Sequence, residues 1–369
     1  MLADDSAVIR GGLSRVIGAD PVIRVVSSVS NGEMAVAAAK RHKPHVVILD
    51  IEMPVMDGLT ALPLILKENP RTKVIMFSGL TEKGAAVTLK AFSLGAVECI
   101  VKPSSAQNVG QGSDFQKQIL ALIKGLVPED ERIAATDLEP ESGMPLQPAQ
   151  HALPAGVRPL PASKPATPFS LHNDFRSYKG KPSLLAIGSS TGGPQALLTV
   201  LKECKGFDIP IVLTQHMPST FTKILAEHIT QHTGVPAAEG VEGEVLQPGR
   251  LYVAPGGRHM HLSRREGKVE IHLDDGPPEN FCKPAVDPML RTAIDIYGDR
   301  ILAVILTGMG TDGLKSGKAL VDRGGRMIAQ DEASSVVWGM PGAVAQAGLC
   351  SQVLPVGEIG PWIRKAVMG

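Results

Sequence analysis

The feature that most constrains the fold of this chain is a proline-rich stretch near its middle. Prolines recur between residues 128 and 178 among Ala, Ser, Gln and Gly, while large apolar side chains are sparse. These prolines are Pro128, Pro140, Pro145, Pro148, Pro154, Pro159, Pro161, Pro165 and Pro168. Such a segment cannot bury enough apolar surface to offset the entropy lost on ordering it. We therefore expect two domains, residues 1–125 and 180–369, joined by a semi-extended linker over residues 126–179.

Both flanking parts alternate short apolar runs with amphipathic stretches. In the first part, strands are expected at residues 22–26, 46–49, 73–77 and 99–101, and helices at 32–40, 85–94 and 115–126. In the second part, strands are expected at 183–187, 210–214 and 301–306, and helices at 196–204 and 221–231. This alternation indicates βαβ units, so the predicted fold class is α/β with a parallel sheet in each domain.

Charge and cysteine content exclude several classes of protein. The 37 Lys and Arg residues balance the 37 Asp and Glu residues, so net charge favours neither nucleic acid nor an acidic membrane surface as a partner. The four cysteines form no CxxC pair, which indicates reduced thiols rather than a disulfide framework or zinc knuckle. The N-terminus has no signal-peptide pattern, and the densest apolar run, residues 301–306, is too short for a transmembrane helix. We expect a cytoplasmic protein.

Polar residues follow successive strands of the first part. Carboxylates, a hydroxyl and an ammonium are expected at one edge of the sheet, from Asp4, Asp5, Asp50, Ser78 and Lys102, the last followed by Pro103. Clustered carboxylates favour Mg²⁺, which together with Lys102 would stabilise a phosphoryl group moving to Asp50. Ser78 would then donate a hydrogen bond to the new phosphate. Each residue alone is more often a turn or cap residue, and only their joint occurrence favours a phosphorylation site.

Residues 1–125 resemble the response-regulator receiver family. The matching motifs are DDS at 4–6, LDIEMPVMDG at 49–58, Ser78 and the Lys102–Pro103 pair. The resemblance implies a flavodoxin-like fold, a histidine-kinase partner, Asp50 as phospho-acceptor, and Mg²⁺ held by Asp5, Asp50 and the backbone of Glu52. Two departures stand out: most of the first, central strand is missing, and Cys99 stands where the family usually has an aromatic switch residue.

The second part contains a glycine-rich turn between a predicted strand and helix. Residues 188–192 fit G-x-S-x-G, with Ser190 in the middle and Pro194 suited to the first turn of the helix. Such a turn lifts the serine hydroxyl out of the sheet, near free N–H groups that would stabilise an oxyanion. A turn of this kind also cradles phosphates, but neither G-x-G-x-x-G nor the P-loop pattern occurs here.

A nucleophilic serine needs a base and a group that orients the base. His216 follows the strand at 210–214, and Asp312 lies in the glycine-rich loop after the strand at 301–306. We therefore interpret Ser190, His216 and Asp312 as nucleophile, general base and imidazole orienter. The oxyanion and substrate are expected near Thr191, Gly192 and Met309.

Other residues of the second part offer alternative site chemistry. Two histidine pairs could bind a metal, but neither has a third ligand at suitable spacing. Asp287 and Asp331 are rivals for the role of the acid, although such residues more often cap helices or lie at the surface. Three methionines are most simply packing residues. The histidine pairs are His259 with His261 and His228 with His232, and the methionines are Met217, Met309 and Met340.

Residues 182–368 resemble the chemotaxis protein-glutamate methylesterase family (CheB type). The motifs are GSSTGG at 188–193, QHMP at 215–218, VAPGGRHM at 253–260, KPAVDPM at 283–289, LTGMGTDG at 306–313 and GMP at 339–341. The resemblance implies the same triad, a doubly wound Rossmann-like esterase domain, and hydrolysis of glutamate methyl esters and glutamine amides on chemotaxis receptors. It also implies that the unphosphorylated receiver covers the cleft and that no cofactor serves catalysis. One departure is Lys-Pro-Ala-Val-Asp in place of the usual Arg-Pro-Ser-Val-Asp.

Overall fold

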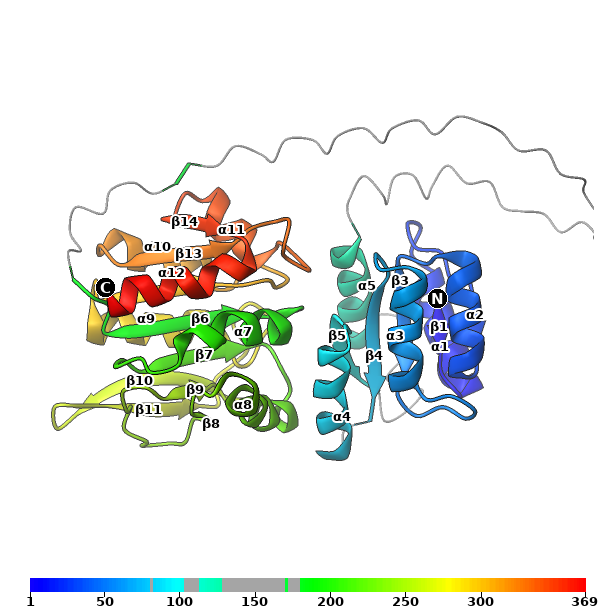
Figure 1. Cartoon of the computed structure of the whole chain (residues 1–369), viewed down its shortest axis with the longest axis horizontal. Coiled ribbons are helices and arrows are strands. Elements are labelled where there is room, and N and C mark those ends of the chain that lie inside the picture. The colour runs from blue at the N-terminus through cyan, green and yellow to red at the C-terminus, as the bar shows by residue number, and fades with distance from the viewer. Residues whose placement is uncertain (80–81, 103–112, 128–169, 172–179) are drawn as a thin grey trace, which may run out of the picture.

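The computed structural model describes residues 1–79, 82–102, 113–127, 170–171 and 180–369 (Figure 1). Most of the expected linker and Pro103 lie outside these residues. In the described part, two α/β domains lie side by side (Figure 1). No helix among the described residues is both long enough and apolar enough to traverse a membrane.

The first domain is a five-stranded parallel sheet in the order β2-β1-β3-β4-β5. The strands are β1 Leu2–Ala3, β2 Ser28–Val29, β3 Val46–Asp50, β4 Lys73–Ser78 and β5 Glu98–Val101. The helices are α1 Ala7–Gly18, α2 Gly32–His42, α3 Gly58–Glu68, α4 Glu82–Ser93 and α5 Asp114–Leu126. This is the topology expected for a flavodoxin-like receiver.

Side chains of β3 alternate between the two faces of this sheet. Val47 and Leu49 pack with α2, α3 and α4, whereas Ile48 packs with α1 and α5. Four of these helices begin at a side chain that accepts a hydrogen bond from the third residue along: Ser6 for α1, Asn31 for α2, Asp57 for α3 and Ser113 for α5. Caps and burial therefore agree on where the helices begin and which face they cover.

The strand expected at residues 22–26 does not form, and that prediction is wrong. Its neighbour β1 has only two residues, so the backbone of residues 22–26 has no strand to pair with. These apolar side chains instead line a cavity of about 400 Å³. The amino group of Met1 is buried beside it, donates to the Val46 carbonyl at 2.9 Å, and has its pKa lowered to about 5 by burial.

The second domain is a seven-stranded parallel sheet in the order β14-β13-β12-β6-β7-β9-β8. Its strands are β6 Leu184–Ser189, β7 Ile211–Gln215, β8 Ala237–Glu239, β9 Leu251–Val253, β12 Ile301–Ile305, β13 Arg326–Gln330 and β14 Gln352–Leu354. An antiparallel hairpin, β10 His259–Arg265 and β11 Lys268–Asp274, lies outside this sheet. The strands expected at residues 183–187, 210–214 and 301–306 are confirmed as β6, β7 and β12, with ends that differ by at most two residues.

Helices cover both faces of the seven-stranded sheet. One face packs with α7 Gly193–Leu201, α8 Ser219–Thr233 and α12 Val356–Met368, with a 3-10 turn, η2 Lys202–Cys204, after α7. The other face packs with α9 Val286–Tyr297, α10 Leu314–Asp322 and α11 Met340–Gln346, and with the hairpin. The chain leaves β6 for β7 on one side and returns to β12 on the other. Loops after β6 and β12 therefore diverge at a topological switch point, where crevices form in such sheets.

Candidate active site

The turn after β6 brings Ser190 to this switch point. Gly192 adopts a φ of +78°, which L side chains rarely take, and a Cβ on Gly193 would overlap the Gln215 side chain. A Cβ on Gly308, in the loop after β12, would lie 2.8 Å from Cβ of Ser190. The glycines of both motifs are thus needed for the backbone to pass this close to the serine.

His216 begins the loop after the neighbouring strand, β7. Ser189 and Gln215 are paired across β6 and β7, and the His216 amide donates to the Ser189 carbonyl at 3.1 Å. Gln215 fixes the turn further, since its Nε2 donates to the Ser190 carbonyl at 2.9 Å and its Oε1 accepts from the Ser189 hydroxyl at 2.6 Å. The polar residues that end the two strands therefore hold Ser190 and His216 on adjacent strand ends.

The Oδ2 atom of Asp312 lies 2.8 Å from the Nε2 atom of the His216 ring. The carboxylate also accepts from the amides of Val286 at 2.6 Å and Asp287 at 3.1 Å, which begin helix α9. Burial alone would raise the pKa of Asp312, but His216 and these amides hold it below its usual value. Burial alone would lower the pKa of His216, but hydrogen bonds with Asp312 and Cys282 outweigh it and raise the pKa to about 9.

Two residues that sequence reasoning missed touch this pair. Cys282 Sγ lies 3.3 Å from Nδ1 of His216, and Asn280 Nδ2 donates to Asp312 Oδ1 at 2.8 Å. Both come from the segment just before the Lys283-Pro284-Ala285-Val286-Asp287 motif. Their proximity to that motif was the available signal, but nothing in their spacing marked them as partners of the His–Asp pair.

Asp287 is buried at 3% exposure, and of the two expected roles, lying at the surface or capping a helix, it has the second, at the first turn of α10. Its Oδ1 accepts from the Ser316 amide at 2.8 Å and its Oδ2 accepts from Asn280 at 3.0 Å. The other rival, Asp331, accepts from the amide and hydroxyl of Ser334 in its own loop. Only Asp312 is bonded to a histidine ring among these three carboxylates.

The Ser190 side chain makes no hydrogen bond to His216 within the described residues. Its residue is 9% exposed, and its amide donates to the Thr307 carbonyl at 3.0 Å. The Thr307 hydroxyl in turn accepts from the amides of Val336 and Val337 at 3.0 Å. One threonine therefore connects the serine turn to the loop that precedes α11.

The first domain contacts the residues expected near the oxyanion and substrate. The Gly192 amide donates to the Val97 carbonyl at 3.1 Å, and the Thr191 hydroxyl donates to Oε2 of Glu98 at 2.7 Å. A Cβ on Gly125 of α5 would lie 3.3 Å from Sδ of Met309. Figure 1 shows α4 and β5 of the first domain next to α7 and α8 of the second. The first domain thus engages groups beside Ser190.

Glu98 is half-buried in this contact. Burial raises the pKa of Glu98, while hydrogen bonds from Thr191 and the Cys99 amide and the charge of His216 act in the opposite direction. Gln195 of α7 adds two more contacts across the domains, from its Nε2 to the carbonyls of Phe92, at 3.2 Å, and Ala96. The contact between domains therefore includes several hydrogen bonds to residues near Ser190 in the chain.

The expected phosphorylation residues lie together at the carboxyl edge of the first sheet. Lys102 Nζ lies 2.6 Å from Oδ2 of Asp50 and 3.0 Å from Oδ2 of Asp4. Carboxylate oxygens of Asp4, Asp5 and Asp50 lie within 4.8 Å of one another. Burial raises the pKa of Asp50 to about 6, with Lys102 acting in the opposite direction. Oxygen ligands this close fit a hard cation such as Mg²⁺.

Two other members of this set are less directly involved. The Glu52 amide donates to Oδ1 of Asp50 at 3.2 Å, and the Ser78 hydroxyl donates to the Gly79 carbonyl at 3.2 Å. Cys99, which stands where receivers usually have an aromatic residue, contacts the Thr88 hydroxyl through its Sγ at 3.2 Å. Ser78 and Thr88 therefore both lie next to the strand that enters the contact with the second domain.

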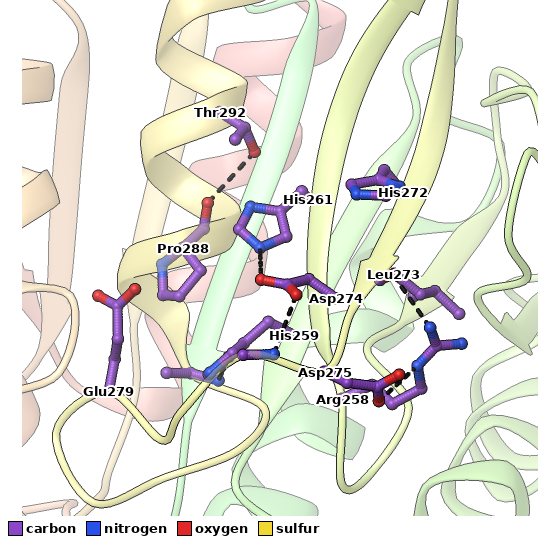
Figure 2. Close-up of polar contacts among 12 residues, drawn as sticks. Arg258, His259, His261, His272, Leu273, Asp274, Asp275, Glu279, Pro288 and Thr292 are labelled. Carbon is purple, nitrogen blue, oxygen red and sulfur yellow. Dashed lines mark hydrogen bonds and ion pairs between the residues drawn. The ribbon is translucent and has the colours of Figure 1, made fainter.

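The histidine pairs have partners other than a metal. His259 uses both ring nitrogens, toward the Pro277 carbonyl and the Ala285 amide, while His261 faces Asp274 at 3.5 Å (Figure 2). The rings of His228 and His232 lie 3.9 Å apart on α8. In the described ranges, Asp4, Asp5 and Asp50 form the one group whose donor atoms are spaced for a metal ion.

Comparison with known proteins identifies similar sequences for both domains. Residues 1–111 match the response regulator receiver domain and residues 185–363 match the CheB methylesterase domain. The chain is 51% identical to protein-glutamate methylesterase/protein-glutamine glutaminase 1 of Paramagnetospirillum magneticum, over 99% of this chain and 95% of that protein. It is 50% identical to the corresponding protein of Azospirillum brasilense, over 99% and 91%. The CheB catalytic domain of Thermotoga maritima is 40% identical, covering 52% of this chain and 100% of that structure, with a TM-score of 0.49.

Proposed function

This chain belongs to the CheB methylesterase family and carries a receiver domain at its N-terminus, and we propose from that premise how its residues perform the reaction. It is a phosphorylation-regulated chemotaxis enzyme, a protein-glutamate methylesterase with protein-glutamine glutaminase activity. We assign the catalytic steps to Ser190, His216 and Asp312.

The reaction is an acyl transfer through a serine ester. The Ser190 hydroxyl attacks the γ-carbonyl of a glutamyl methyl ester and gives its proton to His216. Protonated His216 passes that proton to the methoxide as methanol leaves, and water then hydrolyses the acyl-enzyme with His216 again as base. A glutamine amide follows the same path and releases ammonia. The support is the 2.8 Å contact of His216 with Asp312, at the strand end next to Ser190.

The nitrogen that receives the serine proton follows from this contact. Asp312 faces Nε2 of His216, so Nδ1 is the ring nitrogen left for Ser190. Nδ1 is approached by the Cys282 thiol at 3.3 Å. We therefore assign the described arrangement to the resting enzyme. When substrate binds, Ser190 replaces the Cys282 thiol as the partner of Nδ1.

The receiver inhibits this site by occupying its hydrogen-bond donors. The Gly192 amide, which lies two residues from the nucleophile, donates to the Val97 carbonyl of the receiver. An oxyanion formed at Ser190 needs donors of this kind, so the receiver must withdraw before the amide is free. Phosphorylation then shifts the population from the covered to the uncovered arrangement by stabilising a different receiver conformation.

Phosphorylation takes place at Asp50 in this proposal. Mg²⁺ bound by Asp5, Asp50 and the Glu52 backbone would supply charge for phosphoryl transfer from a chemotaxis histidine kinase. Lys102, which pairs with Asp50 and Asp4, holds the acceptor in place and balances its charge. Ser78 is positioned by its strand end to bind the phosphate and draw its loop inward.

The remaining assignments also belong to this proposal. The domains span residues 1–125 and 180–369, with a linker over 126–179, and the matched regions 1–111 and 185–363 support this division. The partners are methyl-accepting chemotaxis receptors and their histidine kinase, and the enzyme works in the cytoplasm without a catalytic cofactor. Thr191, Gly192 and Met309 border the substrate.

The observation that carries the proposal is the His216–Asp312 hydrogen bond beside the Ser190 turn. The test is methanol release from membranes containing methylated receptors, with and without a small phosphodonor. We expect wild type to release methanol faster with the phosphodonor, Asp50→Ala to lose that response, and Ser190→Ala to release none. Near-normal turnover by Ser190→Ala would exclude the serine mechanism.

A further inference from the structure

One turn beside the catalytic pair exposes an aromatic side chain completely. Phe281 is 102% exposed in the presence of both domains, so no described residue covers its ring. It lies in a two-residue turn, closed by the Glu279 and Cys282 amides, each donating to the other residue's carbonyl at 3.1 and 2.9 Å. Phenylalanine is among the residue types most often buried in folded proteins, so a fully exposed ring is notable when its backbone is also strained.

The backbone of this turn is strained at the phenylalanine. Asn280 and Phe281 adopt φ values of +52° and +63°, the left-handed region. Turns of this shape prefer Asn followed by Gly, because a bulky residue at the second position is unfavourable. Asn280 fits this preference, but Phe281 replaces the glycine. A bulky residue kept in a strained conformation, with no protein contact to repay it, indicates a contact made outside the described chain.

The turn is fixed to the catalytic pair on both sides of Phe281. Asn280 Nδ2 bonds to Oδ1 of Asp312 at 2.8 Å, and Cys282 Sγ lies 3.3 Å from Nδ1 of His216. A fork of hydrogen bonds from Arg291 to Glu279, at 2.7 and 3.1 Å, ties the start of the turn to helix α9. The backbone that carries Phe281 is thus fixed relative to His216 and Asp312.

A hollow lies against the same turn. It has a volume of about 300 Å³ and is lined by Glu279, Asn280, Asp287, Thr311, Leu314 and Lys315. The receiver contacts described above are to Thr191, Gly192, Gln195 and Met309, and they leave Phe281 fully exposed. This rim of the site is therefore open to a protein even in the resting arrangement.

We propose that Phe281 is a docking residue for the protein substrate. The Phe281 ring packs against an apolar side chain of the polypeptide that carries the ester, and this side chain is close in sequence to the modified glutamate. The hollow binds the polar residues next to that apolar side chain. The inference rests on the proposed function, since it names how that same site selects a protein ester over a small one. Aromatic side chains at such positions contribute strongly to protein contacts because they bury a large area with little entropy loss.

The test compares a protein ester with a small ester in the full-length enzyme. Methanol release from methylated receptor membranes and hydrolysis of p-nitrophenyl acetate are measured for wild type and Phe281→Ala. We expect the ratio of kcat/KM for the receptor to that for the small ester to fall about tenfold, mainly through KM. Phe281→Trp should keep the ratio, and the matched control Val241→Ala, at another exposed apolar residue of this domain, should leave both activities unchanged.

A third variant separates docking from a structural role. Phe281→Gly relieves the left-handed strain, so its Tm should be at least that of wild type, while its receptor activity falls as in Phe281→Ala. An unchanged ratio in both variants overturns the proposal. An equal loss on both esters shows that Phe281 only supports the catalytic pair, and a dimer that dissociates in Phe281→Ala assigns the ring to a second copy of the chain. Absence of methanol release by wild type refutes the proposed function instead.

Discussion

Cys282 Sγ lies 3.3 Å from Nδ1 of His216, on the side of the ring opposite the nitrogen that faces Asp312. The thiol and the carboxylate therefore hold the imidazole between them. Both hydrogen bonds contribute to a His216 pKa of about 9, above the usual value of 6.5. A base accepts a proton only when it is deprotonated, so both hydrogen bonds oppose the action of His216 as a base.

The first prediction concerns the thiol. Cys282→Ala removes one of the two interactions that raise the pKa of His216, so the pKa should fall toward its usual value. Because the rate rises as the base loses its proton, the midpoint of the kcat/KM profile should move to lower pH and activity near pH 7 should increase. The pH dependence of p-nitrophenyl acetate hydrolysis checks this. Cys282→Ser keeps a hydrogen-bonding group and should keep most of the shift, and identical profiles for all three enzymes would contradict the prediction.

The second prediction concerns the half-buried residue Glu98 and its carboxyl. Its pKa is raised in the covered arrangement, so the neutral form favours that arrangement and the ionised form opposes it. Inhibition by the receiver should therefore weaken as pH rises through this pKa. Glu98→Gln, which is always neutral, should release less methanol without a phosphodonor than wild type does at neutral pH.

The control for this variant is Glu33→Gln, at an exposed carboxylate in the first turn of α2. It should leave the unphosphorylated rate unchanged. A higher basal rate in Glu98→Gln would show that attraction between this carboxylate and His216 outweighs the cost of burying its charge.

The third prediction concerns the close approach of two loops. An alanine Cβ at Gly308 would lie 2.6 Å from Sδ of Met340 and 2.8 Å from Cβ of Ser190. Gly308→Ala should displace the serine, and shifts of about 1 Å commonly cost about a hundredfold in rate. The matched control is Gly357→Ala in α12, where a Cβ meets nothing within 4 Å. The control should retain full activity and gain up to about 1 kcal/mol of stability, whereas equal rates for both variants would contradict the packing argument.

The fourth prediction concerns Asp50, the proposed phospho-acceptor. The pKa of Asp50 is raised from 3.8 to about 6 in the folded protein. Ionised Asp50 therefore destabilises the folded state relative to the unfolded state. This cost is absent below pH 3.8, grows as pH rises to about 6, and is constant above that. Asp50→Asn removes it and should stabilise the receiver at pH 7 by up to about 3 kcal/mol, at about 1.4 kcal/mol for each pKa unit. Urea unfolding at pH 4 and pH 7 measures this, and the gain should nearly vanish at pH 4.

The sequence predicted the strands whose two faces are both buried, because a short continuous apolar run between turn signals is typical of a strand in a parallel sheet. It also predicted that His216 and Asp312 meet, since residues that follow parallel strands collect at one edge. The strand at residues 22–26 was mispredicted because local pattern does not reveal whether a neighbouring strand is long enough to pair with. Cys282 and Asn280 were missed because a turn far from any strand end contacts the site only through tertiary packing.

The Gly192 amide donates to the Val97 carbonyl. In the proposed mechanism, the receiver and the substrate therefore compete for this one donor. An inhibitor of this kind raises the apparent KM and leaves the limiting rate intact, so a dense field of receptors displaces the receiver even in the absence of phosphate. Local crowding of targets would therefore set a floor of demethylation that signalling raises but never fully switches off.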